Sequence, residues 1–279
     1  MTTEFMTKNK IQKNNIGFPK NQGLYDSSKE HDSCGVGFIV DTNNHATHDI
    51  VSKGLSMLCN LEHRGAVGAD PKAGDGSGIL LQLPHEFFKK KIEHFELPNQ
   101  NEYAVGVFFI KKDNQLRDTI LKKIEDICNR ENLPFLGWRL CPTYEDELGW
   151  SVKPTTPYVY HLFIGKPESI IEQDDFERKI YVLRQCIDKE IMLLGDDYYE
   201  QFYIPSFSSR TILYKGMVLS DQVGTVGNKL GFFEDLSDRS IISSFALIHQ
   251  RFSTNTFPTW SLAQPFRMLC HNGEINTLR

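Results

Sequence analysis

The sequence of 279 residues has no long hydrophobic run. The longest apolar stretch, residues 104–110, is far shorter than the roughly 18 residues needed to span a bilayer. The N-terminus also lacks the apolar segment of a secretory signal. These absences argue against a membrane-spanning helix or a membrane partner, and we expect a cytoplasmic location.

Positive charge is not in excess either. Lys and Arg number 31 against 36 Asp and Glu, and the formal net charge of −5 argues against a nucleic-acid partner. The six cysteines form no C-x-x-C pair, which disfavours a zinc ribbon or a thioredoxin-like site, so we expect no metal. With 40% hydrophobic residues the chain is an ordinary globular protein, and we interpret five of the thiols as structural.

Residues 1–33 differ in composition from the rest. They contain five lysines, no arginine and no regular periodicity up to about Gly23, which is typical of a flexible leader. A disordered terminus is the simplest alternative. An organelle-targeting peptide is disfavoured because such peptides are rich in arginine.

From Cys34 onward, helical and strand periods are mixed without a strict strand–helix–strand order. This mixture favours an α+β layered domain over a doubly wound nucleotide-binding fold. The predicted helices are residues 46–61, 84–93, 114–131 and 174–194, and the predicted strands are residues 34–41, 79–83, 103–110, 135–141, 158–164, 199–206, 211–219 and 243–249.

Cys34 lies where the leader meets the first predicted strand, and Gly35 and Gly37 follow it. Cleavage directly before Cys34 would create an α-amine with an ordinary pKa of about 7.7–8.0, which could take the thiol proton. The alternative is a cysteine at a strand edge with no chemical role.

Glycines are concentrated in Glu-His-Arg-Gly (62–65) and Gly-Asp-Gly-Ser-Gly (74–78). Such density indicates sharp turns or a close approach of the backbone to another group. The second segment precedes a strand and has no G-x-x-x-x-G-K-[ST], so we favour a structural turn beside a site over a phosphate-binding loop. Arg64 and Asp75 could pair there, with a solvated loop as the alternative.

Arg251, in the segment His-Gln-Arg-Phe-Ser-Thr, stands at the end of an apolar strand. A guanidinium at that place can hold a carboxylate with two hydrogen bonds, and Thr254 could add a hydroxyl donor. The alternative is an ordinary surface charge.

The segment Cys-His-Asn-Gly-Glu (270–274) offers a different chemistry. The Asn272 amide and the Gly273 N–H could form an oxyanion hole, although Asn-Gly is also a common turn. We interpret His271 as a packing or orienting residue. Together with the thiol and the guanidinium, this set indicates acyl transfer from an amide substrate that carries a free carboxylate.

These segments resemble the N-terminal glutamine amidotransferase domain of glutamate synthase large subunits. The likeness runs in order from about Gly23 to the last residue and favours glutamate synthase over the amidophosphoribosyltransferase and asparagine synthetase relatives. The matching residues are 23–26, 31–38, 63–66, 74–79, 249–256, Trp260, 263–267 and 271–277.

The resemblance implies an N-terminal-nucleophile hydrolase fold, a four-layer αββα sandwich. It implies that residues 1–33 are a propeptide and that residues 34–279 are the class-II glutamine amidotransferase domain. Hydrolysis of L-glutamine to glutamate and ammonia would proceed through a γ-glutamyl thioester.

The resemblance also assigns a role to each candidate residue. Cys34 would be the nucleophile, with its own amine as the base. Arg251 would bind the α-carboxylate of glutamine, with Thr254 nearby. Asn272 and the Gly273 N–H would form the oxyanion hole.

In the family, further chemistry lies outside the matching residues. The resemblance implies that ammonia passes through a tunnel to a synthase domain and adds to 2-oxoglutarate. Reduction there by FMN and a 3Fe-4S cluster gives a second glutamate, and no cofactor is expected in residues 1–279. The electron donor (ferredoxin, or a small subunit that uses NADPH or NADH) and the oligomeric state stay open.

One departure from the family concerns the C-terminal end. An aspartate downstream of the Asn-Gly pair helps to bind the substrate amino group in the family, and the sequence reaches Arg279 without it. We therefore expect a fragment whose sandwich is incomplete at the C-terminus and whose activity in isolation is low. Two alternatives are another class-II glutamine amidotransferase and a catalytically silent truncated domain.

Overall fold

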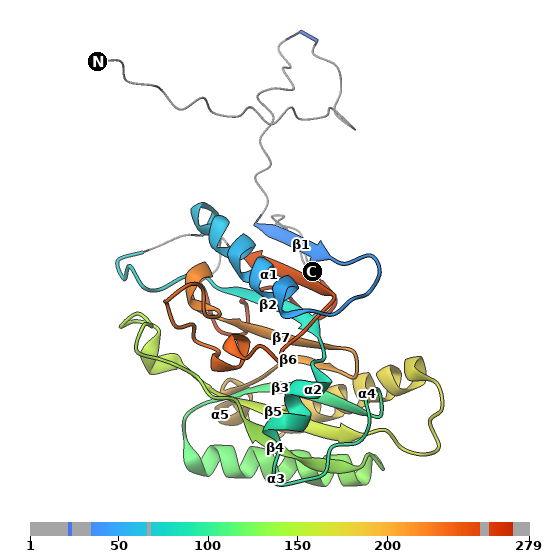
Figure 1. Ribbon diagram of the computed structural model, residues 1–279. Helices are drawn as coiled ribbons and strands as arrows, with labels where there is room; N and C mark the ends of the chain where they lie inside the picture. Colours follow the sequence, from blue (N-terminus) through green and yellow to red (C-terminus); the bar gives the residue numbers. More distant parts are fainter. Residues whose placement is uncertain (1–21, 24–34, 66–67, 252–256, 270–279) are drawn as a thin grey trace, which may run out of the picture. The chain divides into compact units, whose positions relative to one another are not determined.

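Two antiparallel four-stranded sheets form the framework of the domain (Figure 1). The computed structural model describes residues 22–23, 35–65, 68–251 and 257–269. The chain divides into two units at residues 33/34, and the helices and strands below all belong to the second unit. The first sheet has the order β1-β8-β2-β7 and the second β4-β5-β3-β6. The strands are β1 (Val36–Val40), β2 (Ser77–Gln82), β3 (Tyr103–Ile110), β4 (Phe135–Leu140), β5 (Tyr158–Gly165), β6 (Phe202–Ser208), β7 (Thr211–Gly216) and β8 (Phe245–Gln250).

All pairs between these strands are antiparallel. A doubly wound fold is built on parallel strands whose crossovers are helices. The α+β prediction is therefore confirmed.

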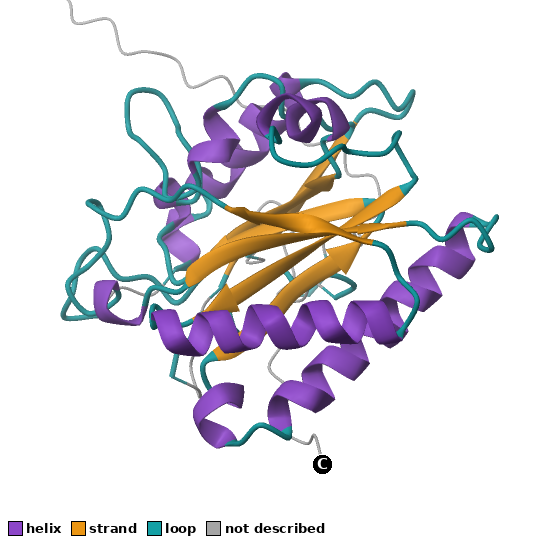
Figure 2. Ribbon diagram, turned by 90° about the horizontal axis from the view of Figure 1, so that it is seen from below, coloured by secondary structure: helices purple, strands orange, loops and turns teal. Residues whose placement is uncertain are grey.

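Helices cover the two sheets on different sides. Helix α1 packs on the first sheet, while α3 and α4 pack their apolar faces on the second, where Figure 2 shows the long helices lying across the strands. Thr47 caps α1 by accepting a hydrogen bond from the Ile50 N–H, and Asp113 caps α3 in the same way from Leu116. The helices are α1 (His48–Asn60), α2 (His85–Lys91), α3 (Asn114–Arg130), α4 (Gln173–Met192) and α5 (Asp196–Tyr199), with short 3-10 turns η2 (Glu62–Arg64), η3 (Lys153–Thr155), η4 (Ser220–Gln222) and η5 (Glu234–Ser237).

The alternation of side chains along β3 explains how two cores form. Val105, Val107 and Phe109 contribute to the core that contains the first sheet, while Phe108 and Ile110 contact the core under α3 and α4. All eight residues of β3 are buried, as expected for a strand covered on both faces.

Two predicted strand boundaries were wrong by three residues. The strand expected at residues 199–206 begins at Phe202, because Gly195 has a positive φ of 116° and the following residues form the turn α5. The strand expected at residues 211–219 ends at Gly216, whose partner Ser77 is the first residue of β2.

Within the described residues, no helix is both long and apolar enough to cross a membrane.

Candidate active site

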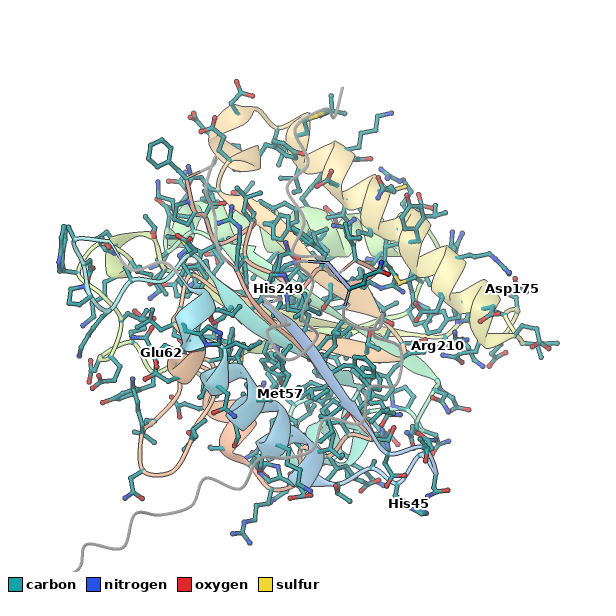
Figure 3. All side chains as sticks on the ribbon, turned by 90° about the horizontal axis from the view of Figure 1, so that it is seen from above. His45, Met57, Glu62, Asp175, Arg210 and His249 are labelled. Carbon is teal, nitrogen blue, oxygen red and sulfur yellow. The ribbon has the colours of Figure 1, made fainter. Side chains whose placement is uncertain are left out.

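Three strand ends meet at one edge of the first sheet. The Gln250 N–H, at the end of β8, donates to the Gly35 carbonyl oxygen with 2.7 Å between nitrogen and oxygen. Val36 at the start of β1 lies opposite His249, and Ser77 at the start of β2 lies opposite Gln250. Figure 3 labels His249 near the centre of the view. The register therefore brings the residue that follows Cys34 in sequence to the end of β8.

Arg251 is the residue that follows β8, and its exposed fraction is 8%. Its N–H donates to the Gly76 carbonyl oxygen at 2.9 Å, and its Nη1 donates to the Asp75 carbonyl oxygen at 3.1 Å. Burial lowers the pKa of the guanidinium from its usual range, and the charge of Asp75 opposes this change. Because arginine ordinarily titrates far above neutrality, the group stays charged and can bind a carboxylate.

Gln250 brings a second buried polar side chain to this edge. Its exposed fraction is 1%, and within the described part of the chain its Oε1 has no hydrogen-bond partner. Gly65 permits this position, because a Cβ there would lie 2.4 Å from the Gln250 Nε2. The glycine of the Glu-His-Arg-Gly segment is thus a point of close approach.

The second glycine-rich segment is a packing surface for residues 257–269. A Cβ at Gly76 would lie 2.8 Å from the Ala263 Cβ, and a Cβ at Gly78 would lie 2.8 Å from the Gln264 carbonyl oxygen. Gly76 also has a φ of 118°, a backbone conformation that favours glycine. The segment runs into β2, which begins at Ser77, and the choice of a structural turn over a phosphate-binding loop stays a prediction.

Of the candidate site residues, the structure describes Arg251. Cys34, Thr254, Asn272 and Gly273 lie outside the described residues, as does the side chain of Arg64, so the predicted pairing of Arg64 with Asp75 stays a prediction.

Residues 34–279 match the family model of class-II glutamine amidotransferases. The chain belongs to this family. The chain is also 44% identical to the glutamate synthase [NADPH] large chain of Bacillus subtilis over 261 residues, 94% of this chain. It is 41% identical to the ferredoxin-dependent glutamate synthase of Pyropia yezoensis over 91% of the chain, and 39% identical to the glutamate synthase [NADH] of Schizosaccharomyces pombe over 94%.

The domain is thus the glutamine amidotransferase part that glutamate synthase large chains share. The chain spans 16% of the Bacillus and Pyropia proteins and 12% of the Schizosaccharomyces protein.

The amidotransferase domain also contains a buried polar cluster between its sheets. Arg139 of β4 donates to both carboxylate oxygens of Asp235, with nitrogen–oxygen distances of 2.7 and 2.8 Å. Cys141 and Tyr214 donate to the same carboxylate, at 3.4 and 3.3 Å. Ligand atoms of Cys141, His161 and Asp235 lie within 4.8 Å of one another, a grouping that the sequence spacing does not reveal.

The electrostatics of this cluster favour an ion pair over a metal centre. Burial, reinforced by the charge of Arg139, lowers the pKa of His161 to about 3. Burial and the charge of Asp235 raise the pKa of the Cys141 thiol well above its usual value. The thiol therefore stays protonated at neutral pH, and the guanidinium already neutralises the carboxylate that a cation would need.

Several thiols of the domain are unreactive by environment. Burial raises the pKa of Cys128 to about 12 and also raises the pKa of Cys59. A reactive cysteine needs a stabilised thiolate. Cys59, Cys128 and Cys141 thus fit the structural role expected of them, while Cys270 lies outside the described residues.

Sequence reasoning missed one residue of the site edge. Lys215 of β7 is 0% exposed and lies opposite Gly78. The signal was present, because this lysine interrupts the apolar strand Thr-Ile-Leu-Tyr-Lys-Gly. A lysine in such a run is buried only when its ammonium group finds partners.

Proposed function

We propose that residues 34–279 hydrolyse L-glutamine to glutamate and ammonia, with Cys34 as the nucleophile. One observation carries the proposal: buried Arg251 lies at the same sheet edge as Gly35, the residue that follows Cys34. A carboxylate held by Arg251 would fix one end of glutamine there. The family membership supplies the reaction class.

The reaction consists of two acyl transfers, the first to the Cys34 thiol and the second to water. The Cys34 thiolate attacks the side-chain amide carbon of glutamine, and the C–N bond breaks as ammonia leaves with a proton. Water then attacks the γ-glutamyl thioester, which releases glutamate and restores the thiol. Asn272 and the Gly273 N–H would hold the oxyanion in both steps, and Arg251 with Thr254 would hold the α-carboxylate.

The base in this proposal is the α-amine of Cys34, which requires removal of residues 1–33 as a propeptide. An amine with an ordinary pKa of about 7.7–8.0 is partly unprotonated at neutral pH. The rate of glutamine hydrolysis should therefore rise as pH increases through the pKa of this amine.

We further propose that the two sheets and their helices form the four-layer αββα sandwich of the N-terminal-nucleophile hydrolases.

For the longer protein, the relatives suggest glutamate synthesis. We propose that ammonia from this domain is added to 2-oxoglutarate in a synthase domain that carries FMN and a 3Fe-4S cluster. The names of the relatives point to NADPH, NADH or ferredoxin as the electron donor. We propose a cytoplasmic location for the whole protein.

The test combines intact mass with glutamine hydrolysis. The purified protein should have lost residues 1–33, and a glutamine-like electrophile should label Cys34. Cys34→Ala should reduce hydrolysis by about 10³-fold or more, as loss of a nucleophile does elsewhere. The matched control, Cys186→Ala, removes a half-buried thiol on α4 and should leave the rate unchanged.

Two results would contradict this proposal. An uncut chain that hydrolyses glutamine at full rate would exclude the amine as base. Equal labelling of all cysteines by the electrophile would show that no thiol is activated, as expected of a catalytically silent domain.

A further inference from the structure

We propose that Lys215 is a positioning residue for glutamine binding, because its ammonium group fastens residues 259–266 against the strand ends that hold Arg251. This inference rests on the proposed function, in which Arg251 binds the substrate carboxylate. No catalytic step is assigned to Lys215.

Lys215 lies among backbone carbonyl oxygens and aromatic rings. Its Nζ donates to the carbonyl oxygens of Ser261, at 2.9 Å, and Ala263, at 2.6 Å. It also lies 4.9 Å from the ring centre of Tyr203 and 4.4 Å from that of Phe266. Among the described residues, no carboxylate oxygen lies within 4.0 Å of this Nζ. Backbone carbonyls and ring faces therefore replace water around a buried cation.

The fastened segment packs on glycines at the strand ends. Ala263 packs on Gly76, and Gln264 packs on Gly78 so closely that neither glycine could carry a side chain without displacement. Trp260 fills the space beside Gly216, where a Cβ would lie 2.4 Å from the indole ring. These glycines leave room for a segment that Lys215 then holds by two hydrogen bonds.

The segment is connected to the Arg251 guanidinium through the peptide of Asp75 and Gly76. Gly76, which Ala263 covers, accepts the hydrogen bond from the Arg251 N–H, and its neighbour Asp75 accepts one from Nη1. Arg267, which directly follows residues 259–266, pairs with Glu177 of α4. Loss of the two Lys215 hydrogen bonds would thus loosen the peptide that orients Arg251, while the Arg267–Glu177 pair stays in place.

Charge provides an independent link between the two cations. Burial, then the charges of Arg184 from α4 and of Arg251, lowers the pKa of Lys215 to about 7. Within the described residues, the ring of Tyr203 from β6 is a further titratable group packed against Lys215, and burial raises its pKa. Lys215 therefore loses its proton near neutral pH, and its grip on the two carbonyls weakens above about pH 7.

The experiment measures the KM for glutamine of the full chain across pH 6 to 9 for wild type and Lys215→Met. In the wild type, KM should rise above about pH 7. In the variant, KM should be about tenfold higher at pH 6.5, independent of pH, with kcat little changed, because a displaced binding group costs affinity first. The matched control, Lys122→Met on the exposed surface of α3, should behave as wild type.

A second readout follows the segment itself. Backbone amides of residues 257–269 should exchange hydrogen faster in Lys215→Met than in wild type, while amides of α3 are unchanged. A soluble variant with wild-type KM, pH profile and exchange would overturn the inference while leaving glutamine hydrolysis intact. If the wild type fails to hydrolyse glutamine, the proposed function fails, and the exchange data still decide whether Lys215 fastens the segment.

Discussion

Two buried polar clusters of this domain balance positive charge in different ways. Between the sheets, the Arg139 guanidinium faces the Asp235 carboxylate through two hydrogen bonds. At the edge of the first sheet, the Lys215 ammonium group faces the carbonyl oxygens of Ser261 and Ala263. One cation meets a full negative charge, and among the described residues the other meets only dipoles.

This difference separates a structural cluster from a binding edge. A carboxylate cancels the charge of a guanidinium, so the Arg139–Asp235 pair ties β4 to η5 without attracting an ion. A carbonyl oxygen satisfies an N–H donor and leaves the positive charge in place. Among the described residues, the Lys215 ammonium group is therefore held without a counter-charge, at the edge where we propose that Arg251 binds the substrate carboxylate.

The largest effect should come from breaking the ion pair between the sheets. Asp235→Asn leaves the Arg139 guanidinium buried without a counter-charge, and the free energy of unfolding should fall by about 3–5 kcal/mol. Denaturant titration measures this loss. The control Glu147→Gln removes the partner of exposed Lys72 and should shift the midpoint little. A variant as stable as wild type would show that the pair adds nothing to the core.

Arg251→Lys tests the cluster at the edge of the first sheet. A single ammonium cannot reproduce the two-pronged hold on a carboxylate, so the KM for glutamine should rise about 10²-fold with little loss of stability. Steady-state kinetics measure the rise. Arg178→Lys changes an exposed arginine of α4 and should leave KM as in wild type. An unchanged KM in Arg251→Lys would remove this residue from the clamp.

Gly76→Ala should have an intermediate effect on the same edge. Its φ of 118° is strained for alanine, and the new Cβ would meet Ala263 at 2.8 Å, so unfolding should become easier by about 1–3 kcal/mol. Gly227→Ala is the matched control, because Gly227 also has a positive φ, 61°, but nothing lies within 4 Å of a Cβ there. Equal losses in the two variants, measured by thermal unfolding, would argue against tight packing on Gly76.

The effects of pH are spread over several units, and each unit should change stability by less than loss of the ion pair does. His161 is buried and neutral, with a pKa of about 3, whereas in the unfolded chain it binds a proton below about 6.5. The unfolded state thus binds more protons between these values, and stability should fall as pH drops from 6.5 to 3, by up to about 1.4 kcal/mol per unit. His161→Gln should flatten this slope in denaturant titrations. A slope equal to that of wild type would assign the loss to other groups.

Lys215 sharpens the comparison in a different pH window. Its pKa of about 7 lies below the ordinary 10.5, so the unfolded state binds more protons between these two values. Stability should therefore rise with pH from about 7 to 10.5, and Lys215→Met should lose this rise. The two clusters would then be distinguished by the pH range in which each acts.

Much of the fold could be predicted because local periodicity is strong where a segment packs on one face. The pattern at residues 103–110 predicted β3 with its observed bounds, and residues 114–131 predicted α3 to within one residue. The strand expected from Tyr199 failed because Tyr198 and Tyr199 favour strands locally, while Gly195 and the two aspartates after it begin a helical turn. Local preference decides an element only where no turn geometry overrides it.

The candidate site was predictable in its chemistry but not in its arrangement. Arg251 stood out at a strand end, and motif likeness, rather than spacing, indicated roles for Cys34, Thr254, Asn272 and Gly273. Nothing in the spacing indicated that Lys215 lies beside the segment around Ala263, 48 residues away.

The sequence by itself determined the class of this protein: a layered α+β amidotransferase domain with a thiol, a guanidinium and an Asn-Gly pair in family order. Only the tertiary structure decided that Arg139 meets a carboxylate and that Lys215 meets backbone carbonyl oxygens. Pairing of β2 with β7 and β8 brings Gly78 between Lys215 and His249, and close packing on the glycines then places Ala263 and Arg251 around the same peptide. The physical reason is that charge balance in a protein interior depends on neighbours in space, which antiparallel register selects and sequence distance does not.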